Sequence, residues 1–335
     1  MRFLALACKC TLMIMMALAL GMTQTVRADS FTFTPIDVPG ALGTQPNGIN
    51  NSGQIVGTFY DSPSGPRHGF LDTGGSFSNV DVPGAFETIL GGINDSGWIA
   101  GSFYDRSLSS HGFLEMGGSI TTFDVPEPGA SLTYATGING AGQIVGFFDS
   151  SEIHGFLDTA GTFSTIDFPG GIDTRPYGIN NVGQIIGTFE DESSRNHGFL
   201  DSGGTFHILD VPGAAYNTEP FGINDKGQIV GDYSLNGRLH GFLYSGGRFI
   251  TLDGPPVYYD TSAFGINDAG QIVGDFDQGT AGFVASAVPE PSSFALLGTG
   301  VVILASYLWN SRRKNPRTSC LGLADCCARL ALSIH

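Results

Sequence analysis

The chain repeats one motif six times, and this periodicity restricts its fold more than any other feature. Gly-Ile-Asn begins at residues 48, 92, 137, 178, 222 and 265. His-Gly-Phe-Leu recurs five times at a constant spacing of 43 residues, and Asp-Val-Pro or a variant recurs six times. A period of this length with glycine and aromatic landmarks is typical of propellers and repeat arrays.

Each unit divides into four short segments with the composition of β-strands. In the first copy they are the residues leading to Gly-Ile-Asn, then "QIVGTFY", "HGFLD" and "SFSNVDV". Asn/Asp-Gly turns such as "NNSG" and glycine pairs such as "TGG" separate them. The second segment is apolar at successive positions, which indicates a strand that is buried on both faces. We expect its glycine, Gly57 in this copy, to allow the close approach of a neighbouring sheet.

The phase of the repeat predicts how the fold closes. The segment "FTFTPIDVPG", Phe31 to Gly40, has a fourth-strand sequence but precedes the first unit, whereas the last unit ends after its third strand. If the N-terminal segment completes the sixth unit, no sheet edge stays open. We therefore predict an all-β fold, a six-bladed β-propeller of four-stranded blades spanning residues 29–287. An open solenoid, which would not need complementary ends, is the alternative.

The Gly-Ile-Asn and His-Gly-Phe pattern resembles the HAF repeats of bacterial extracellular proteins. The resemblance covers nearly all of residues 29–287. It implies export and repetition, and it implies no defined activity.

The N-terminus has the pattern of a secretory signal. Arg2 and Lys9 flank the start of the apolar run "CTLMIMMALALGM", and small residues at Val26 and Ala28 have the spacing that a signal peptidase requires. We predict that residues 1–28 are a signal peptide that signal peptidase removes. A permanent N-terminal anchor is the alternative.

The C-terminal region contains three consecutive elements. A proline-rich motif is followed by the uncharged stretch 294–309, which we predict to be a short transmembrane helix, and then by a basic cluster on the cytoplasmic side. The motif and the cluster comprise Val288, Pro289, Glu290, Pro291, Arg312, Arg313 and Lys314.

These elements resemble the PEP-CTERM sorting signal of Gram-negative bacteria, here spanning 288–314. The resemblance implies a precursor held transiently in the inner membrane and cut near the motif by an exosortase, a membrane cysteine protease. It also implies a link to exopolysaccharide and biofilm. This chain departs from the family pattern in continuing for 21 residues, 315–335, which we expect to be disordered.

Composition excludes several classes of partner. Residues 29–287 hold 29 acidic and 7 basic residues and no cysteine. Such a negative surface repels nucleic acid and anionic lipid, and the exported part needs no disulfide. We expect no resident cofactor or metal, although the acidic loops are compatible with weak calcium binding.

The repeated histidines are candidates for a structural role. Their recurrence in nearly every unit favours a structural role over metal binding or catalysis. We expect each histidine to form a hydrogen bond with a backbone group at the start of the third strand. Threonine four residues before each Gly-Ile-Asn is expected to cap a loop locally. The histidines are His68, His111, His154, His197 and His240.

No nucleophile, zinc or phosphate-binding motif is present. The long loops between the second and third strands and between blades should share one face, the expected binding surface. Aromatic and arginine side chains there that depart from the repeat would suit a sugar ring: Tyr134, Arg175, Tyr177, Tyr216, Tyr258 and Tyr259. The leading hypothesis is a non-enzymatic surface or matrix protein that binds a polymer such as exopolysaccharide. A polysaccharide hydrolase or lyase and an architectural, calcium-bridged surface protein are the alternatives.

Overall fold

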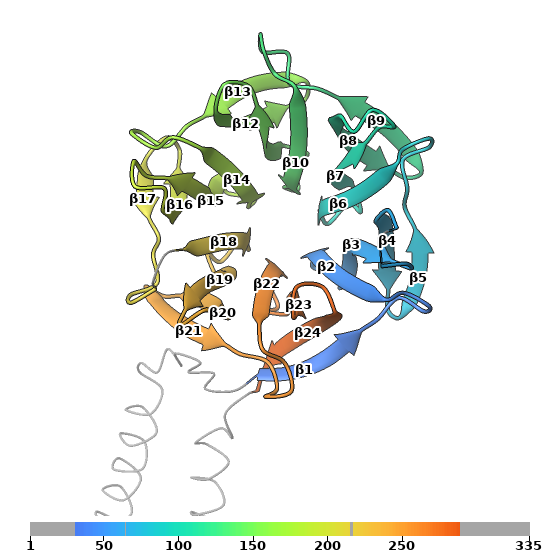
Figure 1. Ribbon diagram of the computed structural model, residues 1–335, viewed down its shortest axis with the longest axis vertical. Coiled ribbons are helices and arrows are strands. Elements are labelled where there is room, and N and C mark those ends of the chain that lie inside the picture. The colour runs from blue at the N-terminus through green and yellow to red at the C-terminus, as the bar shows by residue number, and fades with distance from the viewer. Residues whose placement is uncertain (1–30, 64, 215–216, 289–335) are drawn as a thin grey trace, which may run out of the picture. The chain divides into compact units, whose positions relative to one another are not determined.

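The computed structural model describes residues 31–63, 65–214 and 217–288, and these form a ring of six four-stranded antiparallel sheets (Figure 1). The predicted six-bladed propeller is confirmed. Strand β1 (Phe31–Ile36) pairs with β24 (Ala281–Ala287) and is the outermost strand of the sixth blade. The first and last strands therefore close the ring by backbone hydrogen bonds, as the phase of the repeat predicted.

The first five blades run in chain order from an inner strand beside the axis to an outer strand at the rim, and in the sixth the outer strand is β1 (Figure 1). The first three blades are β2 (Gly43–Ile49), β3 (Gln54–Tyr60), β4 (His68–Thr73), β5 (Ser76–Asn79); β6 (Glu87–Ile93), β7 (Ile99–Tyr104), β8 (Ser110–Met116), β9 (Ser119–Phe123); and β10 (Leu132–Ile138), β11 (Ile144–Asp149), β12 (Ile153–Thr159), β13 (Thr162–Ile166). The last three are β14 (Thr174–Ile179), β15 (Gln184–Glu190), β16 (Asn196–Ser202), β17 (Phe206–Ile208); β18 (Thr218–Ile223), β19 (Ile229–Leu235), β20 (Arg238–Ser245), β21 (Arg248–Leu252); and β22 (Thr261–Ile266), β23 (Ile272–Phe276), β24, β1.

The predicted signal peptide, sorting signal, transmembrane helix and tail lie outside the described residues, apart from Val288. Within the part of the chain that is described, no helix has the length and apolar character needed to cross a membrane.

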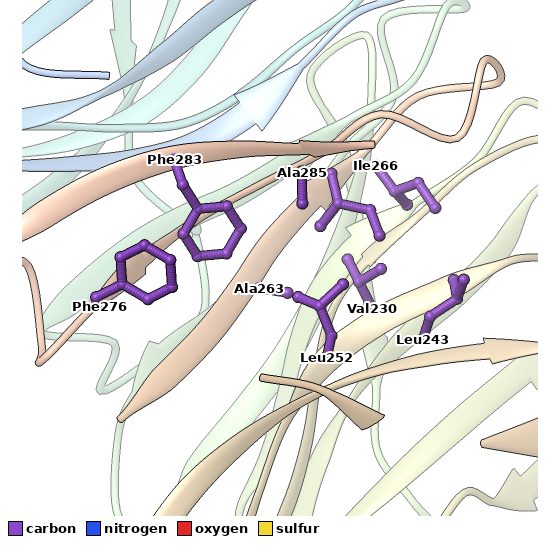
Figure 2. Packing of buried hydrophobic residues seen from close by; sticks show 9 residues of the cluster. Val230, Leu243, Leu252, Ala263, Ile266, Phe276, Phe283 and Ala285 are labelled. Carbon is purple, nitrogen blue, oxygen red and sulfur yellow. The ribbon is translucent and has the colours of Figure 1, made fainter. Parts of the chain in front are cut away.

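The phenylalanine of His-Gly-Phe is the main apolar anchor of each blade. The six equivalent side chains are at most 1% exposed, and burying one contributes about 1.5–3 kcal/mol. The core clusters join neighbouring blades: Val230 and Leu252 of the fifth blade pack with Phe283 of the sixth (Figure 2). The anchors are Phe70, Phe113, Phe156, Phe199, Phe242 and Phe283.

The glycine of the second strand meets its own blade rather than a neighbouring sheet, so that expectation was wrong. A Cβ placed on Gly57 would overlap the Gln45 carbonyl oxygen and the Pro46 Cα atom, both in β2. The register of β2 and β3 shifts between Pro46 and Gly48. This β-bulge brings the two strands too close for any side chain at position 57.

The asparagine of Gly-Ile-Asn connects each turn to the next blade. In the first blade, the Ser52 and Gln54 N–H groups donate to Asn50 Oδ1 (3.1 and 2.9 Å), while Asn50 Nδ2 donates to the Asn94 carbonyl oxygen (3.1 Å). The same interblade bond recurs around the axis at 2.9–3.3 Å and forms a closed circle of buried side chains: Asn50, Asn94, Asn139, Asn180, Asn224 and Asn267.

The repeated threonine caps the connection that enters its blade, as predicted. Thr44 Oγ1 accepts a hydrogen bond from the Val38 N–H (3.0 Å), and the equivalent bond is present in all six blades. These threonines and asparagines satisfy buried backbone groups at every interface, which explains why the repeat keeps them.

Candidate functional site

The repeated histidines brace the blades through a carboxylate. Nδ1 of each ring lies 2.7–3.1 Å from a carboxylate oxygen of the aspartate thirteen residues later. The predicted partner, a backbone group, was therefore wrong. The aspartate itself holds the backbone in two blades, because the Gly69 and Gly198 N–H groups donate to Asp81 and Asp210. The pairs are His68–Asp81, His111–Asp124, His154–Asp167, His197–Asp210 and His240–Asp253.

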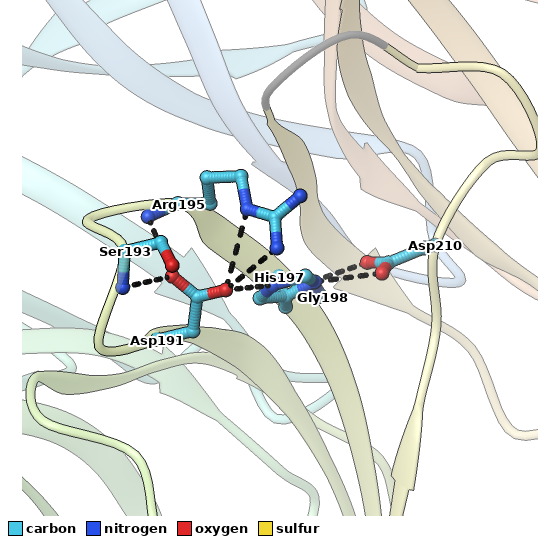
Figure 3. Close-up of polar contacts among 6 residues, drawn as sticks. All are labelled: Asp191, Ser193, Arg195, His197, Gly198 and Asp210. Atoms are coloured by element: carbon cyan, nitrogen blue, oxygen red, sulfur yellow. Dashed lines mark hydrogen bonds and ion pairs between the residues drawn. The ribbon is translucent and has the colours of Figure 1, made fainter.

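The fourth blade carries the most extended of these networks (Figure 3). His197 Nδ1 lies 2.7 Å from Asp210 Oδ2, and its Nε2 lies 3.2 Å from Asp191 Oδ2. Burial lowers the pKa of His197, but hydrogen bonds to Asp210 and then Asp191 outweigh it, so the net shift is upward. Backbone hydrogen bonding from Arg195 is the main cause that lowers the pKa of Asp191 to about 2.

This network stabilises a loop and has no metal-binding geometry. Asp191 accepts the Ser193 and Arg195 N–H groups (2.8 and 3.1 Å) and pairs with the Arg195 guanidinium (3.1 Å). Across residues 31–63, 65–214 and 217–288, no group of three or more His, Cys, Asp or Glu side chains is placed to hold a metal ion.

The axial channel is too narrow for a sugar. It widens at two levels to about 80 Å³ each, whereas small-molecule sites usually enclose about 300–1,000 Å³. Tyr177 stands in its wall, packed edge-on against Phe221 at 5.1 Å between ring centroids. Burial raises the pKa of Tyr177 to about 12. The channel can hold water molecules, and its aromatic side chains serve to pack it.

The predicted ligand residues do not converge on one site. Arg175 pairs with Asp173 (3.1 Å). Tyr258 stacks on Phe276 with 4.3 Å between centroids, and Tyr259 is 60% exposed beside Arg238. Tyr216 lies outside the described residues, and Tyr177 belongs to the channel wall described above. None of them lines the cavity described next, although the Tyr134 hydroxyl lies 3.2 Å from that of Tyr104, which does.

A cavity of about 450 Å³ lies between blades 1 and 2, on the face that carries the long loops. We call it the blade 1–2 pocket. Two tyrosine rings, Tyr60 and Tyr104, come from the ends of the second strands, and Ser62 and Arg67 come from the loop that follows β3. Glu87 at the start of β6 completes its polar lining, with Ile89 beside it. Its volume is in the range of small-molecule sites.

Glu87 departs from a contact that two other interfaces make at the same position. At the equivalent positions, Asp173 accepts the Ile153 N–H (3.0 Å) and Asp260 accepts the Leu239 N–H (2.9 Å), each across a blade interface. Glu87 instead reaches the Arg67 guanidinium, with 3.7 Å between Oε1 and Nη1. This longer carboxylate therefore lies along the wall, and the space beside Tyr60 stays open.

The lining of the pocket combines ring faces with hydrogen-bonding groups. The side chains of Arg67 and Glu87 are 53% and 20% exposed, so their ion pair is weak and can exchange with a ligand. Glu87 is the single carboxylate among the described lining residues, whereas glycoside hydrolysis normally needs two carboxyl groups about 5–9.5 Å apart. The described lining therefore offers aromatic rings, a guanidinium and one carboxylate to a ligand.

Sequence reasoning missed Tyr60, Arg67, Glu87 and Tyr104. The signal was present as departures from the repeat, because the residues aligned with Tyr60 and Tyr104 in the other blades are Asp149, Glu190, Ser234 and Asp277. The expected binding face includes the loop that holds Arg67, but the apolar pattern of "QIVGTFY" predicts a buried strand and so hides Tyr60.

A comparison with protein-family models decides the nature of the C-terminal segment. Residues 287–314 match the PEP-CTERM protein-sorting motif. The motif marks the chain as an exported protein that is processed by an exosortase from a membrane-anchored precursor in Gram-negative bacteria. The match is confined to this segment, so the HAF character of the repeats stays a prediction.

No curated protein matches the chain. Among solved structures, similarity extends to virginiamycin B lyase from Staphylococcus aureus (13% identity, 77% of this chain, 100% of the lyase, TM-score 0.45). It also extends to Aleuria aurantia lectin (12%, 77% and 99%, TM-score 0.48) and a gluconolactonase from Xanthomonas campestris (11%, 77% and 98%, TM-score 0.46). These likenesses are too distant to transfer any activity.

Proposed function

We propose that the propeller is a non-enzymatic binding domain that attaches a neutral polysaccharide at the cell surface or in the extracellular matrix. The blade 1–2 pocket carries this proposal. Aromatic rings stack on the apolar faces of sugars, while Arg67, Glu87 and Ser62 supply donors and acceptors for hydroxyl groups.

Charge selects among polysaccharides. Residues 29–287 carry 29 acidic against 7 basic residues, and a negative field of this size disfavours an anionic polymer. In the pocket, the one guanidinium is already beside a carboxylate. A neutral glycan meets neither obstacle.

The test is a glycan array with purified residues 29–287, followed by titration of each ligand. Tyr60→Ala and Tyr104→Ala should each weaken binding at least tenfold, because stacking is lost. Tyr259→Ala is the matched control, since it removes an exposed tyrosine near the loop between blades 5 and 6 and should leave affinity unchanged. A bound neutral glycan that is indifferent to both pocket variants, or no bound glycan at all, would overturn the proposal.

A turnover assay on every bound glycan separates binding from the hydrolase or lyase alternative. We expect no new reducing or unsaturated ends. Their appearance in wild type, and loss in Glu87→Gln, would make the protein an enzyme.

Delivery of the protein to the cell surface or matrix requires cleavage at the sorting motif. With its exosortase present, wild type should lose the segment beyond Pro289-Glu290-Pro291 and leave the membrane fraction, whereas Pro289→Ala/Glu290→Ala should stay anchored. Intact mass and fractionation check this. A mature wild-type chain that keeps Arg312 in a host that processes such signals would make the segment a plain anchor.

A further inference from the structure

Aromatic side chains continue from the pocket toward blade 3. Tyr104, which lines it, also contacts Tyr134 of blade 3: their hydroxyl oxygens are 3.2 Å apart and their ring centroids 6.3 Å apart. Tyr134 stacks on Phe147 with 4.8 Å between centroids and an interplanar angle of 26°. Three consecutive blades therefore present tyrosine rings in sequence, and the last is held in place from behind.

Exposed apolar side chains accompany the first two tyrosines. The Leu42 N–H donates to the Tyr60 carbonyl oxygen, and the Phe86 N–H donates to that of Tyr104, both at 2.8 Å. The side chains of Leu42 and Phe86 are 53% and 48% exposed. Backbone bonds thus fix an exposed apolar residue beside each pocket tyrosine.

We propose that Leu42, Tyr60, Phe86, Tyr104 and Tyr134, together called the aromatic strip, bind consecutive sugar residues of one chain. The ligand is then an internal stretch of a neutral polysaccharide rather than a chain end or a single sugar. This inference rests on the proposed function and adds that the ligand is long enough to extend across blades 1 to 3.

Two features favour a polysaccharide as the occupant. The strip alternates ring and apolar surface with the hydroxyls of Tyr104 and Tyr134 and the Arg67–Glu87 pair, a mixture that matches the apolar faces and hydroxyl edges of sugar rings. The strip itself contains no acidic or basic side chain, and Arg67 and Glu87 beside it pair with each other, whereas a protein or lipid partner of opposite charge would need an unpaired basic or acidic patch.

The experiment measures affinity against chain length by calorimetric titration. The probes are gluco-oligosaccharides of one to six units from the α-1,4, β-1,4 and β-1,3 series, with the corresponding series for any other neutral glycan bound on the array. We expect affinity to rise at least tenfold between one and four units. Phe86→Ala and Tyr134→Ala should abolish this rise and leave single-sugar affinity within twofold.

Ile172→Ala is the matched control, because Ile172 is the exposed residue at the position of Phe86 in blade 4, and its N–H likewise bonds a strand-end carbonyl, that of Glu190. It should change nothing. Tyr134→Phe, which keeps the ring, should retain the rise with length. Phe86 is at the surface, so Phe86→Ala should fold and still test the proposal if Tyr134→Ala does not fold.

The outcomes separate the two proposals. Affinity that is independent of length but lost in Tyr60→Ala would overturn the strip and leave the pocket intact. A rise with length that survives Phe86→Ala and Tyr134→Ala would also overturn it. Absence of binding at every length would remove the proposed function itself.

Discussion

The interface between blades 1 and 2 and the interface between blades 5 and 6 solve the same packing problem in opposite ways. At the position after the glycine of the second strand, blades 1 and 2 have the small polar residues Thr58 and Ser102. The charged groups at this interface, Arg67 and Glu87, lie at the edge of the pocket. Blades 5 and 6 have Asp232 and Asp275 at this position, 5% and 1% exposed.

The two aspartates are in an environment that suits the protonated form. Burial raises the pKa of Asp232 to about 8 and that of Asp275 to about 7. The Ser262 hydroxyl donates to Asp232 (2.6 Å), whereas Asp275 Oδ2 has no hydrogen-bond partner. The same repeat therefore accommodates an open polar pocket in one part of the ring and buried acids in another. The asparagine circle and the buried phenylalanines are present in every blade and stabilise both regions.

The largest effect should come from removing strand β1. Deleting residues 31–40 would expose the edge of β24 and remove Phe33, whose ring contacts Phe276 and Phe283 at 5.5 and 5.1 Å between centroids. We expect a loss of more than about 4 kcal/mol in the free energy of unfolding. Urea denaturation measures it, with Thr32→Ala as the surface control. A deletion that melts within a degree or two of wild type would mean that closure is unimportant and that the two interfaces are independent.

The buried acids should make stability depend on pH. Both folded-state pKa values lie above the ordinary value of an aspartate, so the unfolded chain ionises first and stability falls as pH rises from about 4 to about 8. Each carboxylate can contribute a slope of up to about 1.4 kcal/mol per pH unit. Burial of Glu219, whose pKa is also raised, adds to the same trend, and Asp260 and Asp277 are the other acids that face the pair.

Asp232→Asn/Asp275→Asn should flatten this profile and increase stability at pH 8 by about 2 kcal/mol or more. Denaturation at pH 5 and pH 8 measures the difference, and Asp61→Asn beside the blade 1–2 pocket is the control that should leave the slope unchanged. An identical slope in wild type and the double variant would show that the two buried aspartates impose no such cost on the folded state.

The smallest effect should come from the histidines. His111 is 27% exposed at its side chain, so His111→Ala should lower stability by about 0.5–1 kcal/mol, and the sixth blade already has Ala281 at this position. Thermal unfolding measures the change. His240→Ala is the comparison at a more buried position, because the His240 side chain is 16% exposed. Bound zinc or copper that survives dialysis and is lost with the histidine would contradict a structural role.

Features set by local chemistry were predictable from individual residues. The Asn-Gly turns and the capping by Thr44 follow from backbone requirements within a few residues. The position of β1 also followed, because a fourth-strand sequence at Phe31–Gly40 has only one vacant place in six units. The partner of His111 could not be predicted, since bonding to Asp124 depends on the register of β8 and β9.

The sequence predicted that a binding surface would contain aromatic residues, but it did not predict which residues form the candidate site. A loop face with aromatic residues was expected, but Tyr134 lies in strand β10 and only contacts the pocket residue Tyr104, and the residues that line the pocket were not singled out. Whether Tyr60 packs or lines a cavity depends on the length of one side chain in the next blade, Glu87, and on the direction in which it reaches.

The sequence by itself determined the number of blades, their strand order and the closure of the ring, because each of these follows from a period, a turn signature or a count of strands. Only the tertiary structure decided that the blade 1–2 interface opens into a pocket and that blades 5 and 6 bury Asp232 and Asp275. Those outcomes depend on side chains from different blades sharing one space, and the polarity and volume of that space are properties of the pair that neither residue carries alone.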